Sequence, residues 1–158
     1  MTVQTEPKNP DFHVNTQWRF LYDTLCSKGK AAKDNEYWIF QKYTQFYSFA
    51  AALGFAHNKQ NPVKSGYTPF SLMEMKDDPE WPALRAIAWK ASNCDLDVVL
   101  DHTKTIKICD EYADGGMQYL YEQFFEPHCK DGHLLRPKHI DIEGALSLIV
   151  MGTKRHAF

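Results

Sequence analysis

A cluster of small residues within an otherwise bulky segment is the feature that most restricts how this chain can fold. Three alanines, Ala50–Ala52, lie between Phe49 and Leu53, and Gly54 follows directly. Small side chains let the backbone of a second helix come close, because the distance between packed helices depends on the side chains at their contact. We therefore predict a central helix from about Glu36 to Leu53, apolar on nearly all sides by its end, with Gly54 as its left-handed C′ residue.

A second long segment repeats apolar residues at helical spacing. One face of a helix would carry Ile106, Cys109, Ala113, Met117, Leu120, Tyr121 and Phe124. Gly115 and Gly116 interrupt this helix at a cost of about 2 kcal/mol relative to two alanines, so a close helix crossing or a deliberate break should compensate. The acids on the same segment, Asp110, Glu111 and Asp114, are most simply a solvated face.

Shorter elements follow from capping residues and apolar spacing. Asn15 or Thr16 is expected to cap a first helix, Asp77 or Asp78 a helix after "DDPEWP", Asp95 a short helix, and Asp141 a last helix that ends at Gly152. The stretch "FSLMEM" is predicted to be a short strand. The predicted apolar faces of the first and third of these helices are Trp18, Leu21, Tyr22 and Leu25, and Leu84, Ile87, Ala88 and Ala91.

These elements define the expected fold class. With 158 residues, of which 44% are hydrophobic, the chain fits one compact core. We expect a mainly α, single small helical domain of about five to six helices with at most a short β element. Residues 1–14 would be a flexible N-terminal tail, 15–152 the helical domain and 153–158 a basic C-terminal tail.

Charge is distributed unevenly along the chain, although the formal net charge is only −2. Residues 28–73 carry six lysines against two acids, whereas residues 74–126 carry twelve acids against five bases. Such a chain can present a basic face and an acidic face. The longest apolar runs, "FAAALGFA" and "ALSLIVM", fall far below the roughly 20 residues of a membrane span, and the polar N-terminus resembles no signal peptide. We expect a cytoplasmic protein with no membrane partner.

Two patterns could support catalysis. Glu74 and Lys76 form Glu-x-Lys after a predicted strand, which is half of a common metal-dependent nuclease site; the other half would need an acid on a neighbouring strand. His128, Cys129, His133 and His139 are clustered, but their spacing matches no standard zinc site. We assign no catalytic, metal or cofactor residues and expect no cofactor.

The strongest candidates for binding are basic. Lysines neutralise phosphates, and aromatic residues interleaved with them, such as Trp38 and Tyr43, could stack on bases or belong to the core. The candidate residues for binding DNA or a protein partner are Lys28, Lys30, Lys33, Lys42, Lys59 and Lys64.

Four stretches together resemble one family. They are "YTQFYSFAAALGFAHNK", "YTPFSLMEM", "ALRAIAWKASNCDLDVVL" and "ICDEYADGGMQYLYEQF", in this order over about residues 16–126. The family is that of the small DNA phosphorothioation-associated (Dnd system-associated) proteins, the fourth of that set. The resemblance implies a bacterial protein encoded among DNA-modification and anti-phage defence genes, and implies no catalytic residues. It also suggests that the Phe49–Phe55 and Glu111–Gly116 motifs are two helices that cross closely.

These observations lead to one functional hypothesis and one alternative. The hypothesis is a non-catalytic accessory subunit of a bacterial DNA-targeting anti-phage defence complex, with a larger ATPase or nuclease subunit and DNA as the expected partners. The alternative is a small metal-dependent nuclease that uses Glu74 and Lys76.

Overall fold

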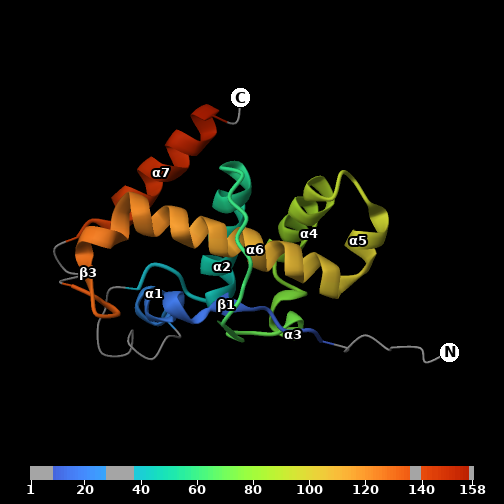
Figure 1. Cartoon of the computed structure of the whole chain (residues 1–158), viewed down its shortest axis with the longest axis horizontal. Coiled ribbons are helices and arrows are strands. Elements are labelled where there is room, and N and C mark those ends of the chain that lie inside the picture. The colour runs from blue at the N-terminus through green and yellow to red at the C-terminus, as the bar shows by residue number, and fades with distance from the viewer. Residues whose placement is uncertain (1–8, 28–37, 136–139, 157–158) are drawn as a thin grey trace.

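The computed structural model describes residues 9–27, 38–135 and 140–156, with side chains described as far as Met151. The long helix α6 (His102–Leu120) runs through the middle of the molecule, and the other elements gather around it (Figure 1). Seven α-helices and two short two-stranded sheets make up the described ranges, which confirms a mainly α fold with little β structure. None of these helices is long and apolar enough to span a membrane.

Helix α2 (Tyr43–Ala56) makes the most extensive contact with α6. Ala51, Gly54, Gly115 and Gly116 are all buried, as the sequence predicts. A Cβ atom on Gly54 would overlap the carbonyl oxygen of Tyr112, and one on Gly116 would overlap that of Ala50. The two backbones thus touch directly, and α6 continues through its glycine pair without a break.

The end of α2 differs from the expectation. The helix extends to Ala56, and Gly54 lies inside it rather than at C′. Asn58 takes the left-handed conformation, with φ of 53°. The N–H of Lys59 donates to the Gly54 carbonyl at 2.8 Å and that of Asn58 to Phe55 at 3.1 Å, the paired bonds of a Schellman end. Gly54 is a helix residue because the approach of α6 leaves no room for a side chain there.

The N-terminal segment joins the core earlier than expected. We assigned residues 1–14 to a tail, but Phe12 and Val14 are buried. The Phe12 ring packs on Phe70 and Tyr47, with centroids 4.8 and 5.1 Å away. Strand β1 (Val14–Asn15) pairs antiparallel with β2 (Gly66–Tyr67), and then come η1 (Thr16–Trp18) and α1 (Arg19–Leu25). The predicted face of Trp18, Leu21, Tyr22 and Leu25 is buried.

Three helices follow β2. The predicted strand "FSLMEM" is wrong: Leu72–Met75 form the short helix α3, which buries Leu72 and Met75. Helix α4 (Glu80–Ala91) buries Leu84 and Ala88 on α2 and α6. In α5 (Leu96–Leu100), the Asp95 carboxylate accepts from the Asp97 N–H at 3.0 Å, which confirms the predicted cap.

The C-terminal part of the chain begins where α6 ends, at Leu120. A π-helical turn, η2 (Tyr121–Phe125), and a 3-10 turn, η3 (Glu126–His128), extend α6. A hairpin of β3 (Cys129–Lys130) and β4 (His133–Leu134) then turns through Asp131 and Gly132, both with positive φ, as the tightest hairpin turns require. Helix α7 (Ile142–His156) starts at the predicted Asp141 cap and continues past Gly152.

Candidate functional site

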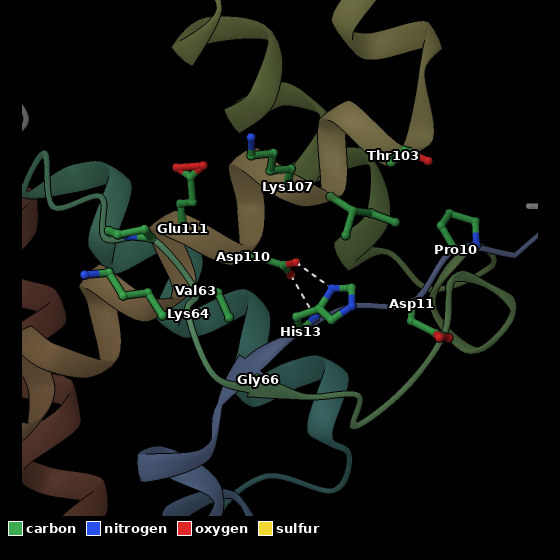
Figure 2. A pocket seen from close by; sticks show the side chains of 12 residues that line it. Pro10, Asp11, His13, Val63, Lys64, Gly66, Thr103, Lys107, Asp110 and Glu111 are labelled. Atoms are coloured by element: carbon green, nitrogen blue, oxygen red, sulfur yellow. Dashed lines mark hydrogen bonds and ion pairs between the residues drawn. The ribbon is translucent and has the colours of Figure 1, made fainter. Parts of the chain in front are cut away.

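A cleft of about 660 Å³ lies beside α6. Its walls are the N-terminal residues 10–13, the loop 62–66 and the first half of α6, three segments that are distant in the sequence. Figure 2 shows that they converge around His13 and Asp110. The lining residues are Pro10, Asp11, His13, Pro62, Val63, Lys64, Gly66, Thr103, Ile106, Lys107, Asp110 and Glu111.

Asp110 is the buried polar centre of the cleft, with a relative exposure of 5%. One carboxylate oxygen accepts from the backbone N–H of His13 at 3.1 Å and from the Tyr47 hydroxyl at 2.7 Å. The other oxygen lies 3.2 Å from Nδ1 of the His13 ring. These bonds compensate a carboxylate that would otherwise be costly to bury.

The ionisation of this pair follows from its surroundings. Burial raises the pKa of Asp110, although hydrogen bonds from His13 and Tyr47 oppose the rise. The hydrogen bond to Asp110 raises the pKa of His13 above its ordinary 6.5. With Nδ1 held by Asp110, Nε2 is the other nitrogen of a half-exposed ring that lines the cleft. The pair fixes the orientation of an imidazole, which can then hydrogen-bond a ligand or accept a proton.

A second buried carboxylate lies one helical turn further along α6. The same oxygen of Asp114 accepts from Nδ2 of Asn15 at 2.6 Å and from Nε1 of Trp18 at 2.8 Å. We expected Asp110 and Asp114 on a solvated face, and this expectation is wrong, because the N-terminal segment covers them. Asn15 was expected to cap a helix with its side chain; instead that side chain binds Asp114. Together the two aspartates hold residues 13–18 against α6.

The loop after α2 forms the opposite wall. It crosses α6 at Gly115, where a Cβ atom would overlap the carbonyl oxygen of Lys59. The backbone N–H of Asn61 donates to the Glu111 carbonyl at 3.1 Å, and the Gln60 amide donates to the Glu111 carboxylate at 3.2 Å. The absence of a side chain at Gly115 therefore lets the loop approach α6, whereas its absence at Gly116 lets α2 approach.

The structure places the six candidate lysines in different settings. Lys59 and Lys64 are exposed on the loop that crosses α6, and Lys64 lines the cleft. Lys42 lies apart from them, and its ammonium group is 3.4 Å from Asp78. Lys28, Lys30 and Lys33 fall outside the described residues. Lys107, which the sequence analysis missed, also lines the cleft.

The residues considered for metal-dependent chemistry lie elsewhere. Glu74 and Lys76 are exposed at α3, and Glu74 is on a helix rather than at the end of a strand. His128, Cys129 and His133 belong to η3 and the hairpin, and His139 lies outside the described residues. Within the described ranges, no three His, Cys, Asp or Glu residues are grouped closely enough to hold a metal ion.

The fold and the site together define the class of protein. It is a small, mainly α protein with a preformed cleft and exposed lysines at the edge of that cleft. The model of one family, DNA sulphur modification system-associated protein 4, matches residues 25–135. The match covers more than half of the chain, so the protein belongs to this family, as the resemblance suggests. The chain matches no curated protein and no solved structure. The matched range includes α6 with both aspartates, whereas His13, Asn15 and Trp18 precede it.

Proposed function

We propose that the protein is a non-catalytic, cytoplasmic accessory subunit of a bacterial DNA-targeting defence complex, where it bridges a larger ATPase or nuclease subunit and DNA. Family membership carries this proposal, because the family is defined by its association with a DNA sulphur modification system. A system of this kind has several components, and a 158-residue chain is suited to a binding role among them.

The shape of the site also supports binding. Two exposed lysines, Lys59 and Lys64, lie on a loop whose backbone is fixed to α6 through Gly115 and Glu111. Cationic side chains on a fixed backbone can contact phosphates, or the acids of a protein partner, with little further ordering.

Copurification tests the accessory role. The tagged protein is expressed from its native operon, the lysate is treated with nuclease to remove DNA, and the retained proteins are identified by mass spectrometry. We expect a larger ATPase or nuclease subunit encoded in the same operon to be retained. A monodisperse protein that retains no product of its operon would contradict the proposal.

The nuclease alternative is tested separately with Glu74→Ala. Glu74 is exposed, so its replacement should leave the fold unchanged. An accessory subunit keeps full system activity in this variant, whereas a nuclease that uses Glu74 and Lys76 loses it. Glu74 lies on a helix rather than at the end of a strand, which argues against the nuclease alternative.

A salt titration tests the contact with DNA. The logarithm of the binding constant should fall with the logarithm of the salt concentration, with a slope of about −0.9 for each phosphate contact. If some of the six lysines are engaged, the slope should be about −2 to −4. Changing Lys28, Lys30 and Lys33 together to Glu should weaken binding for all sequences and flatten the slope. If the triple variant instead loses its protein partner, and the wild type shows no affinity for DNA at low salt, these lysines serve protein docking.

A further inference from the structure

The cleft beside α6 has apolar walls and a polar interior. Pro62 and Val63 line it from the loop, Ile106 from α6 and Pro10 from the N-terminal segment. Its volume of about 660 Å³ lies within the range of about 300–1,000 Å³ that is usual for sites of small organic ligands. Apolar walls of this kind suit the faces of an aromatic ring better than a small ion.

The acidic and basic groups of the cleft lie at different depths. Asp110, the deepest acid, already accepts three hydrogen bonds from His13 and Tyr47. Glu111 accepts from Gln60, and Figure 2 shows the Asp11 carboxylate pointing away from His13. The cations that remain are the ammonium groups of Lys64 and Lys107, which Figure 2 shows at the outer edge, away from His13.

From its interior to its edge, the cleft presents groups that suit the base and then the phosphate of a nucleotide. Apolar walls face a base, an imidazole with a fixed orientation meets the edge of that base, and cations at the edge of the cleft meet a phosphate. We propose that the cleft binds one unpaired nucleotide of a single-stranded nucleic acid, with the base between Val63 and Ile106, its edge on Nε2 of His13, and its phosphates near Lys64 and Lys107. The inference rests on the DNA contact of the proposed function and adds the form of nucleic acid and the place where it binds.

Two consequences follow from the geometry. A duplex keeps its bases paired and stacked, so it cannot place one in the cleft without breaking a pair. One imidazole at the base edge distinguishes the bases only weakly, so affinity should depend little on sequence. The same chemistry could come from a free mononucleotide, and the experiment therefore includes both.

NMR on the wild-type protein provides the first test. The probes are 5′-dAMP, a fifteen-residue single strand of deoxyadenosine, the same strand in a duplex, and inorganic phosphate. We expect the single strand to shift the His13 ring signals and the Val63 methyl signals, and phosphate to shift neither. Stronger effects from 5′-dAMP than from the strand would identify a free nucleotide as the ligand and overturn the strand assignment. No shift at His13 or Val63 with any probe would overturn the site.

A variant that fills the cleft provides the second test. Val63→Trp places a large ring between the walls and leaves the lysines in place, and Thr68→Trp, at an exposed position of the same segment, is its control. We expect Val63→Trp to bind the single strand at least 10-fold more weakly with an unchanged salt slope, and Thr68→Trp to bind like the wild type. Lys107→Gln should reduce the slope by about 1. Wild-type affinity in a folded Val63→Trp protein would overturn the proposal.

The two proposals can fail independently. Copurification after nuclease treatment does not depend on the cleft, so a protein that retains its partner but shows no His13 response refutes only the nucleotide site. A protein that binds the single strand through His13 and Val63 but retains no partner refutes only the accessory role.

Discussion

Helix α6 is held by α2 and by the N-terminal segment in two different ways. At the α2 contact, Gly54 and Gly116 bring two backbones together, and the Tyr47 hydroxyl donates to the Asp110 carboxylate beside them. At the N-terminal contact, Asp110 and Asp114 accept hydrogen bonds from His13, Asn15 and Trp18. The first contact depends mainly on shape and fixes the fold, whereas the second depends on polarity and ionisation and forms one wall of the cleft.

The largest effect should come from breaking the α2–α6 contact. Leu at Gly116 would force a side chain into the backbone of Ala50, where no flexible atom can move aside. We expect Gly116→Leu to lower the free energy of unfolding by about 3 kcal/mol or more, roughly 6–12 °C in Tm for a chain of this size. Ala52→Leu adds the same side chain on the exposed face of α2 and should change it by less than about 0.5 kcal/mol. Equal melting of Gly116→Leu and wild type would refute the close contact.

A smaller loss should follow from removing the acceptor at the N-terminal contact. Asp114→Ala leaves Nδ2 of Asn15 and the buried Nε1 of Trp18 without their partner, which should cost about 2–3 kcal/mol. Asp114→Asn keeps a carbonyl oxygen at that place and should cost about half as much. Chemical denaturation measures both. If Ala and Asn behave alike, the hydrogen bonds are not what holds residues 15–18.

The pH dependence of stability distinguishes the two contacts. Because the pKa of His13 is raised, the folded state binds this proton more tightly than the unfolded state. The resulting stability is fully present below about pH 6.5, the ordinary histidine value, and is lost as the pH rises through the raised pKa. The raised pKa of Asp110 acts in the same direction, from the ordinary carboxyl range upward.

His13→Gln checks this sign, since it removes the imidazole and keeps a polar side chain. The charged groups that line the cleft together with His13 are Asp11, Asp110, Glu111, Lys64 and Lys107, and all of them remain in the variant. The difference in Tm between wild type and His13→Gln should shrink as the pH rises from 6 to 9. A difference that stays constant or grows would contradict the assigned ionisation.

The smallest effect should appear at the ion pair between Lys42 and Asp78. Its side chains are partly exposed, with relative exposures of 43% and 19%, so solvent weakens the attraction. Lys42→Met should lower stability by about 0.2–1 kcal/mol in a denaturation titration. A loss as large as that of Asp114→Ala would show that this pair belongs to the structural core.

The α2–α6 contact was predictable because its signal is local. Small residues at Ala51, Gly54, Gly115 and Gly116 interrupt two apolar helices, and a close contact was one of the two ways to compensate for them, the other being a break in the helix. The same reasoning misplaced the end of α2, because glycine is common both at helix ends and at helix contacts. The Asp131–Gly132 pair could have indicated the hairpin, since Asp-Gly favours its turn.

The cleft was not predictable from local patterns. His13 and Asp110 are separated by 97 residues, and acids spaced four residues apart on a helix usually face water. Phe12 is fully buried, although it follows a polar segment with two prolines, a pattern that predicts an exposed tail. Long-range pairing decides such positions, and periodicity carries no information about it.

Amide hydrogen exchange of wild type and Asp114→Asn tests most directly whether α6 is held by two separate contacts, because Asp114 accepts hydrogen bonds from Asn15 and Trp18 of the N-terminal segment. In the wild type, the central amides of α2 and α6 should exchange only through global unfolding, and those of residues 12–18 through a smaller local opening. Asp114→Asn should lower the protection of residues 12–18 much more than that of the α2–α6 contact. Equal loss of protection at both places would contradict the account, because it would make the cleft and the helix contact one cooperative unit.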